Sequence, residues 1–259
     1  MEMVAVIGGS GFYEFLSDTE EVPTQTPYGA PSAPVTVGRI GARPVAFLPR
    51  HGARHEFAPH TINYRANLWA LRSVGVRRVL APCAVGSLQA ELGPGDVVVP
   101  DQLVDRTAGR QQTFMDAGAA HVGFADPYCP TLRSALLAPG LARDGGTMVV
   151  VDGPRFSTRA ESQWYAAQGW SLINMTGHPE AVLARELAMC YAPIAVVTDR
   201  DAGIEGGESV TQEEVFAVFK ENIERLRELL ADVVADLPED AGCECRDSLA
   251  GLDVAFELP

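Results

Sequence analysis

The sequence predicts an α/β fold, with a single domain built on a central mixed β-sheet that is flanked by helices. Short apolar runs typical of buried strands alternate along the chain with segments of helical periodicity, a pattern that characterises α/β proteins. The chain has 259 residues, which is long enough to bury a full hydrophobic core. Because no linker or low-complexity segment divides it, we predict one domain over residues 1–237, followed by a polar, irregular tail over 238–259.

Continuous apolar runs predict the strands. Residues 3–7 are apolar and lead into Gly8-Gly9-Ser10-Gly11, so we expect a buried strand that ends in a tight glycine turn. In open α/β sheets, ligands bind beyond the carboxyl ends of the strands, which makes the residues at those ends candidate site residues. The other strands are expected, in chain order, at 35–37, 45–48, 79–84, 97–99, 147–151, 172–175 and 194–197.

Helical spacing and capping patterns predict the helices. Thr158 and Thr211 are each followed three residues later by Glu, which matches the capping box that opens a helix. Pro179 suits a first helical turn, and we expect that helix to continue to about Cys190. The predicted helices span, in chain order, residues 61–74, 132–141, a segment opening at 158–161, 179–190 and 211–235.

The charge balance argues against nucleic acid as a partner. With 20 Lys and Arg against 34 Asp and Glu, the formal net charge is −14, whereas neutralising nucleic-acid phosphates requires a basic surface. A few local cations would still suffice to bind a small anion. No window reaches the roughly 18 apolar residues of a membrane span, and the start Met-Glu-Met-Val lacks the features of a signal peptide. We therefore expect a cytoplasmic enzyme with no membrane partner.

The five cysteines are an odd and sparse set. Cys83, Cys129 and Cys190 lie in apolar contexts, so we expect reduced, buried thiols. Cys243 and Cys245 form a C-x-C pair in the tail, but a zinc site needs about four ligands and no His lies near this pair. We therefore predict no metal site.

Three segments carry groups suited to binding an anion. The glycine turn presents backbone N–H groups together with the Ser10 hydroxyl. Arg50 and His51 directly follow an apolar run, where Arg provides a permanent bidentate cation and His a further donor. Thr176 lies between a strand end and a helix start, and a helix N-terminus favours an anion. Taken alone, each feature also fits a tight turn, a surface basic cluster or a helix cap.

Two acidic residues, Asp199 and Asp201, follow the last predicted strand. If strand geometry persists, both side chains point the same way, and Arg200 between them points to the other face. Such a pair is typical of a metal site, of a carboxyl with a raised pKa, or of a solvated surface pair. The chain contains no GxSxG, HExxH, Walker A or zinc pattern, and so offers no evident nucleophile. Displacement by a bound phosphate fits this inventory.

Several motifs, in order and at compatible spacing over residues 3–235, resemble those of the methylthioadenosine phosphorylases, which belong to the trimeric branch of the purine nucleoside phosphorylases. The resemblance implies a phosphorylase-type fold, a homotrimer, and a reaction that uses no cofactor and takes inorganic phosphate as a co-substrate. The matching segments are Gly8–Gly11, Pro49–Gly52, Asn63–Asn67, Ala84–Leu88, Pro94–Asp96, Asp101–Gln102, Gly153–Ser157, Asn174–Thr176, Pro179–Glu180, Thr198–Asp199 and Asp201.

The resemblance also implies roles for individual residues. Ser157 occupies a position linked to base specificity, and His121 one that reaches the 5′ pocket of a neighbouring subunit. Cys83 and Arg200 depart from the family pattern, because they stand where the family has a small hydroxyl residue and an aromatic residue, respectively. The residues expected to bind phosphate are Ser10, Arg50, His51, Cys83, Ala84 and Thr176. Those expected to contact base and sugar are Phe156, Ser157, Asn174, Met175, Asp199, Arg200, Asp201, His121 and His55.

The chemistry implied by the resemblance is attack of phosphate on C1′ of a nucleoside while an acid protonates N7 of the departing purine. We assign the acid to Asp199, with Asp201 as helper. Because carboxylates suit a 6-amino group, we predict cleavage of 5′-methylthioadenosine to adenine and 5-methylthioribose 1-phosphate. The alternative is a 6-oxopurine nucleoside phosphorylase acting on inosine, guanosine or methylthioinosine. A non-catalytic nucleoside-binding protein on the same scaffold is an alternative of a different class.

Overall fold

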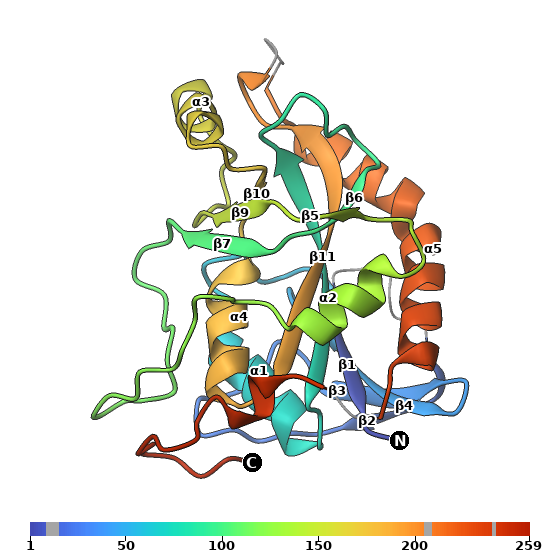
Figure 1. The fold of residues 1–259 in the computed structure, drawn as a ribbon, viewed down its shortest axis with the longest axis vertical. Coiled ribbons are helices and arrows are strands. Elements are labelled where there is room, and N and C mark those ends of the chain that lie inside the picture. The colour runs from blue at the N-terminus through green and yellow to red at the C-terminus, as the bar shows by residue number, and fades with distance from the viewer. Residues whose placement is uncertain (9–15, 205–208, 240–241) are drawn as a thin grey trace.

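The computed structural model in Figure 1 describes residues 1–8, 16–204, 209–239 and 242–259. Eleven strands form one sheet, in which the order β2-β3-β4-β1-β5-β10-β9-β7 is extended by β11, β6 and β8. Parallel pairs such as β1–β4 and antiparallel pairs such as β3–β4 both occur, so the predicted mixed sheet is confirmed. The strands are β1 (Val4–Gly8), β2 (Ser17–Val22), β3 (Val35–Ile40), β4 (Arg43–Pro49), β5 (Arg78–Ser87), β6 (Val97–Val99), β7 (Gln102–Asp105), β8 (Arg143–Asp144), β9 (Thr147–Val150), β10 (Leu172–Asn174) and β11 (Cys190–Arg200).

Helices cover both faces of the sheet (Figure 1). The predicted capping boxes are present, because the Thr158 side chain accepts from the backbone N–H of Glu161 and the Thr211 side chain from that of Glu214. The helices are α1 (Tyr64–Ser73), α2 (Pro130–Leu137), α3 (Arg159–Ala167), α4 (Gly177–Glu186), α5 (Gln212–Asp236) and the 3₁₀ helix η2 (Glu244–Asp247). Within the described residues, none of the helices is both long and apolar enough to cross a membrane.

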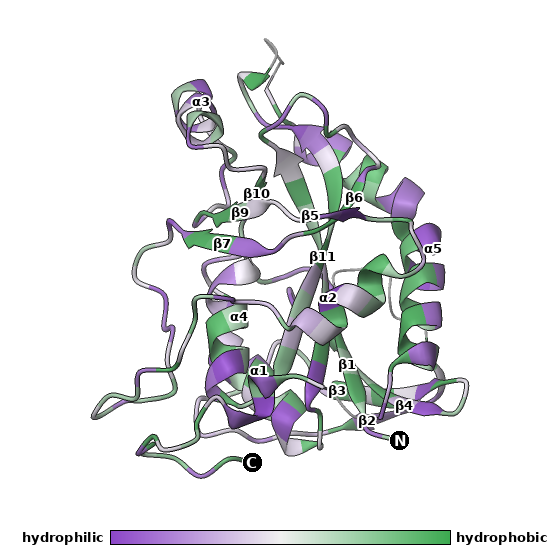
Figure 2. Cartoon of the chain, in the orientation of Figure 1, coloured by the Kyte–Doolittle hydropathy of each residue, from purple (hydrophilic) through white to green (hydrophobic). Residues whose placement is uncertain are grey.

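The core has two halves, one on each face of the sheet. Alternate residues of a strand point to opposite faces, and in β1 the side chains of Ala5 and Ile7 pack with α1 and α4, while those of Val4 and Val6 pack with α2 and α5. In Figure 2, hydrophobic residues run along β1 and β11, and hydrophobic and hydrophilic bands alternate on α5. Burial on both faces explains why the central strands are continuous apolar runs.

The predicted end of one helix was wrong, and three strands were missed. The helix expected over 179–190 ends at Glu186, and Cys190 already belongs to β11. Ala188, with a φ of 52°, turns the chain between them, and apolar residues on both sides conceal this boundary in the sequence. Strands β2, β7 and β8 were not predicted. Strand β2 is exposed and charged, β8 is an exposed pair of charged residues, and β7 is a half-buried run of four residues, so none of them forms a buried apolar run.

The long strands β5 and β11 position the candidate site. They pair in parallel from Cys190, opposite Arg78, to Arg200, opposite Ser87, with a bulge between Val197 and Asp199. The sequence analysis placed Asp199 beyond the end of the last strand. In the structure, Asp199 lies inside that strand, β11.

Candidate active site

Three predicted site residues contact one strand, β5, at alternate positions. The Arg50 guanidinium donates to the carbonyl oxygen of residue 82 (3.1 Å), the Asn174 amide donates to that of residue 84 (3.0 Å), and Asp199 pairs with residue 86. Each residue of a strand advances by about 3.3 Å, so the positions 82 to 86 span about 13 Å. The anion-binding candidates and the acid pair therefore lie along one line.

Arg50 is buried in an ion pair with a residue that the sequence analysis did not assign to the site. Its Nε and Nη2 atoms donate to the two carboxylate oxygens of Glu180, at 2.6 and 3.0 Å. Nη1 donates to Pro82 and Nη2 also donates to Ile7, at 3.1 and 3.0 Å. Among the described residues, four of the five N–H groups thus have an acceptor, which leaves one Nη1 hydrogen for a ligand.

His51 is a neutral imidazole of defined tautomer. The carbonyl oxygen of Phe57 can only accept, so Nδ1 of His51 donates to it across 2.9 Å and Nε2 carries the lone pair. Burial, together with the charge of Arg50, lowers the pKa of His51 to about 4. The ring stacks on His55, with 4.3 Å between the centroids, and His55 in turn contacts Phe216 of α5 edge-on at 5.6 Å.

Of the three other residues predicted to bind phosphate, Cys83 and Ala84 lie on β5, and Ser10 is not described. Cys83 is buried in β5, and burial raises the pKa of its thiol to about 12, so it is a neutral group. Ala84 is half-buried next to it in the same strand. Ser10 lies outside the described residues, so its predicted role remains a prediction.

The Asn174 side chain organises the beginning of α4. Its Oδ1 accepts from the backbone N–H groups of Thr176 and Gly177, both at 2.7 Å, while its Nδ2 donates to Ala84. Thr176 is buried beside it as the N-cap residue of α4, and its hydroxyl lies 3.5 Å from the same Oδ1. These hydrogen bonds make Asn174 a residue that positions Thr176 against β5, and its predicted contact with substrate stays a prediction.

The Asp199 carboxyl lies in a half-buried environment beside β5. Burial raises its pKa to about 6, against an opposing hydrogen bond from the Thr198 hydroxyl to Oδ2 (2.8 Å). The negative charge of Asp201 raises the pKa further. A carboxyl with this pKa is partly protonated near neutral pH and can donate a proton.

Asp201 is more deeply buried than Asp199 and is held by hydroxyl groups. Only 2% of the residue is exposed, and its Oδ2 accepts from Ser162 of α3 at 2.5 Å. Burial raises its pKa, while hydrogen bonds from Ser162 and Ser157 lower it. These donors stabilise the carboxylate and leave Asp199 as the carboxyl that is better placed to carry a proton.

The acid pair depends on close approach to Gly86. A Cβ atom added to Gly86 would lie 2.9 Å from Oδ1 of Asp199, 2.9 Å from Cγ2 of Ile173 and 3.4 Å from Cβ of Asp201. Any side chain larger than that of glycine would therefore push Asp199 or Ile173 away from β5, whereas the 3.4 Å to Asp201 is an ordinary contact.

The remaining predicted substrate contacts lie on several segments, some half-buried and some exposed. Met175 packs against Gly153, where an added Cβ would lie 2.5 Å from its sulfur. Phe156 and Ser157 are half-buried on the loop before α3, and Ser157 also lines a cavity of about 140 Å³. Arg200 is exposed and donates to the carbonyl of Ala90 at 3.4 Å, and His121 is exposed.

Besides Glu180, the sequence analysis missed two residues that hold the site together. Ser162 fixes Asp201, and Arg110 donates to the carbonyl oxygens of Met175, His178, Val151 and Asp152 at 2.6 to 3.3 Å. Arg110 thereby joins the Met175 segment to the chain leaving β9. One indication for Glu180 was available, because a buried Arg requires a carboxylate partner.

Comparison with known proteins identifies the family. Residues 3–235 match the profile of the phosphorylase superfamily. A Mycolicibacterium smegmatis protein named S-methyl-5′-thioadenosine phosphorylase is 61% identical over 259 residues, which cover 99% of this chain and 100% of the relative. A Streptomyces coelicolor protein named purine nucleoside phosphorylase is 56% identical over 272 residues, which cover 99% of this chain and 97% of that protein.

Solved structures agree with this assignment. The crystal structure of a methylthioadenosine phosphorylase from an antarctic soil metagenomic library has a TM-score of 0.87 and 38% identity, and the match covers 96% of this chain and 92% of that one. The Schistosoma mansoni methylthioadenosine phosphorylase in complex with adenine has a TM-score of 0.85 and 36% identity, with 91% of each chain covered. The chain, with its phosphorylase fold and its sequence matched over nearly its full length, belongs to the phosphorylase superfamily.

Proposed function

We propose that this protein cleaves the N-glycosidic bond of 5′-methylthioadenosine with inorganic phosphate, giving adenine and 5-methylthioribose 1-phosphate. The names of several relatives support this substrate, among them that of the 61% identical M. smegmatis protein. The observation that carries the proposal is the line along β5 from Arg50, through Asn174 and the Thr176 backbone that Asn174 holds, to Asp199. Phosphate would lie at one end of this line and the purine at the other, with the ribose between them.

At the phosphate end, binding would depend on hydrogen bonds and not on net positive charge. Glu180 already neutralises Arg50, so the guanidinium offers one further N–H and a fixed geometry. Thr176, just before α4, adds a buried hydroxyl; the backbone at His178 is extended (φ −116°, ψ 133°), so the regular turns of α4 begin only after that residue. Neutral His51 presents the Nε2 lone pair, which can accept from a protonated phosphate oxygen.

At the purine end, the departing base accumulates negative charge unless N7 is protonated. Asp199, with a pKa of about 6, would supply this proton as the general acid. The hydroxyl donors of Asp201 would favour its carboxylate against the opposing effect of burial, and its negative charge raises the pKa of Asp199. Phosphate held against C1′ would supply proximity and stabilise the positive charge of the sugar in the transition state. The reaction would need no cofactor and no metal.

The identity of the base follows from the two acids. A carboxylate accepts a hydrogen bond from the 6-amino group of adenine, whereas a 6-oxopurine presents an acceptor there, and a mispaired buried polar group costs about 1–3 kcal/mol. The second candidate is a 6-oxopurine nucleoside phosphorylase; the name of the 56% identical S. coelicolor relative, purine nucleoside phosphorylase, supports a purine nucleoside as substrate without specifying methylthioadenosine.

The proposed setting of the reaction is a cytoplasmic homotrimer that takes part in purine and methionine salvage. His121 is exposed on the segment between β7 and α2, where a neighbouring subunit could receive it in its 5′ pocket. Small molecules, the nucleoside and phosphate, would be its ligands, with no nucleic acid or membrane partner, in keeping with a net charge of −14.

The test is a comparison of steady-state rates with methylthioadenosine, adenosine and inosine, each with and without phosphate. We expect the highest kcat/KM with methylthioadenosine and no turnover in the absence of phosphate. A preference for inosine would support the second candidate and contradict the argument from the two acids. Turnover without phosphate would mean hydrolysis, and binding without any turnover would indicate a nucleoside-binding protein.

A further inference from the structure

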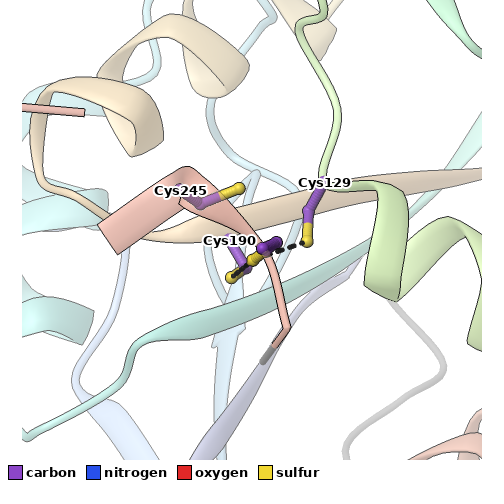
Figure 3. A group of neighbouring side chains, drawn as sticks. Cys129, Cys190 and Cys245 are labelled. Atoms are coloured by element: carbon purple, nitrogen blue, oxygen red, sulfur yellow. Dashed lines mark hydrogen bonds between the residues drawn. The ribbon is translucent and has the colours of Figure 1, made fainter. Parts of the chain in front are cut away.

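Four of the five cysteines come together at the end of the molecule where the C-terminal segment meets the core. Cys129 is the N-cap residue of α2, Cys190 is the first residue of β11, and Cys243 and Cys245 lie at the start and inside of η2. Figure 3 shows the side chains of Cys129, Cys190 and Cys245 brought together from these three elements. We call these four residues the cysteine cluster.

The spacing of the four sulfur atoms fits a tetrahedral metal site. All four Sγ atoms lie within 4.8 Å of one another, and Cys243 Sγ is 3.6 Å from that of Cys129 and 3.4 Å from that of Cys190. For metal–sulfur bonds of about 2.3 Å, the sulfurs of a tetrahedral zinc site lie about 3.8 Å apart. The observed sulfur–sulfur distances, from 3.4 Å to at most 4.8 Å, lie on both sides of this value. A metal could therefore bind after only small movements of the side chains.

We propose that the cysteine cluster binds one Zn²⁺ ion through four thiolates, as a structural site. Four sulfur ligands in a tetrahedron select a soft or borderline metal such as zinc over Mg²⁺ or Ca²⁺. Binding would replace the four S–H protons, which are released to solvent, by four Zn–S bonds, with no change of oxidation state. This proposal replaces the expectation from the sequence that the protein has no metal site.

The surroundings of the cluster favour a closed, preformed site. Cys129, Cys190 and Cys245 are buried, with 1%, 1% and 6% of each residue exposed. The backbone N–H of Cys129 donates to the carbonyl of Tyr191 at 2.8 Å, which fixes α2 against the start of β11 before any metal binds. Cys129 also lies at the N-terminus of α2, whose dipole favours an anionic sulfur.

Such a site would act on stability and not on catalysis. With four protein ligands, it leaves no open position for a substrate. Cys190 and Asp199 are nine residues apart on the same strand, which corresponds to about 30 Å at about 3.3 Å per residue. The metal would fasten the C-terminal segment, which packs Phe256 against Trp69 and Phe114, to the sheet.

Metal analysis of the full-length protein tests the proposal directly. The protein is purified under reducing conditions without a chelator, and its metals are measured by inductively coupled plasma mass spectrometry. We expect about one zinc per chain. Replacement of zinc by Co²⁺ should give the intense visible bands and the sulfur-to-metal charge-transfer bands of tetrahedral cobalt thiolate, a signature that needs no variant.

Single substitutions locate the metal. Cys245→Ser and Cys190→Ser should lose the bound zinc, whereas Cys83→Ser, the matched change at the one cysteine outside the cluster, should retain it. Removal of zinc by a chelator should lower the melting temperature by several degrees and leave kcat/KM for methylthioadenosine unchanged.

The proposal is overturned if the reduced protein holds no zinc even after incubation with Zn²⁺, or holds iron instead. It is equally overturned if mass spectrometry of the protein, with thiols alkylated before unfolding, finds the four cysteines paired in disulfides. Zinc that stays bound in Cys245→Ser would place the metal elsewhere and also contradict it.

Discussion

At the scale of single residues, the acid pair shows how one local environment gives two carboxyls different roles. Asp199 and Asp201 both lie against Gly86, and burial raises the pKa of both. The hydroxyls of Ser162 and Ser157 stabilise the charge of Asp201, whereas Asp199 receives one hydroxyl, that of Thr198, from the residues that the structure describes. Pairs of carboxyls whose environments differ in this way are typical of acid–base catalysis.

Substitution of Asp199 tests the assignment of the acid. Asp199→Asn keeps the shape of the side chain but removes the proton donor, so we expect kcat on methylthioadenosine to fall by about 10²- to 10⁴-fold. In the parent protein, kcat/KM should decline as the pH rises through about 6, where Asp199 loses its proton. Steady-state kinetics from pH 5 to about 8 check both expectations. An Asp199→Asn protein with normal turnover would show that the proton comes from another group.

The same substitution should stabilise the fold at neutral pH. The pKa of Asp199 is about 6 in the folded protein and ordinarily 3.8, so between these values the folded state binds more protons, and the free energy of unfolding falls as the pH rises. Above about pH 6, ionised Asp199 lowers the free energy of unfolding by its full amount, on the order of 2–3 kcal/mol. We expect Asp199→Asn to be more stable than the parent at pH 8 and equally stable near pH 4, as measured by urea unfolding. A difference that does not depend on pH would refute this linkage.

Gly86 offers a test of the close approach between β5 and the acids. In Gly86→Ala, the new methyl group would lie 2.9 Å from both Asp199 and Ile173, so the carboxyl must move and activity should fall by at least about tenfold. Gly93→Ala is the matched control, because its Cβ would meet the nearest atom, on Arg200, at an ordinary 3.5 Å. Equal activities of the two variants would contradict the packing argument.

At the scale of the elements, α4 and β5 both provide hydrogen-bond acceptors that fix the Arg50 guanidinium. Helix α4 brings Glu180 to Arg50 from 130 residues away, and the hydroxyl of Tyr191 on β11 donates to the same carboxylate at 2.9 Å. Arg50 therefore links β4, α4 and β5 in one buried network. Such a network fixes the geometry of the guanidinium before phosphate binds.

Breaking this network should destabilise the fold and weaken phosphate binding together. Glu180→Gln leaves the Arg50 charge buried without a counter-ion, which typically costs about 3–5 kcal/mol. We expect a loss of this size in urea unfolding and a raised KM for phosphate. The double variant Arg50→Met/Glu180→Leu, which removes both charges, should lose less stability than Glu180→Gln alone. If the double variant loses more, the ion pair is not the source of the effect.

At the scale of the whole molecule, the α/β/α layers separate two centres. The acid pair lies toward one end of β11, and the cysteine cluster lies at its other end, where the C-terminal segment packs. A long strand, paired on both sides and buried on both faces, is a rigid spacer between them. Stability at one end can therefore change without a change in the geometry of the other.

Association of subunits is the prediction that belongs to this scale. A homotrimer of the 27.7 kDa chain would have a mass of about 83 kDa, three times that of one chain, which light scattering after size exclusion measures. If His121 enters the 5′ pocket of a neighbour, His121→Ala should change the preference for methylthioadenosine over adenosine by about 1–3 kcal/mol in kcat/KM. An unchanged preference in a trimeric protein would mean that subunits do not share the site through His121.

The sequence by itself determined the class of fold and most of the strands and helices. It also located the acid pair, Asp199 and Asp201, and the neighbouring residues Arg50 and His51. Apolar runs and capping boxes involve residues that are close together in the sequence, so they can be recognised without knowing which distant segments they pack against. It also showed the Cys243–Cys245 pair, but not a cluster.

Tertiary structure alone decided which of these residues meet. Glu180 reaches Arg50 from 130 residues away, and Cys129 reaches Cys243 across 114. The sequence analysis also missed the exposed edge strand β2 and the end of α4 before Ala188. Their neighbours in the folded structure, and not their own residue types, determine these two features. Burial, pairing and the pKa of Asp199 depend on which groups the packed chain places within a few ångströms, and that information is spread over the whole chain.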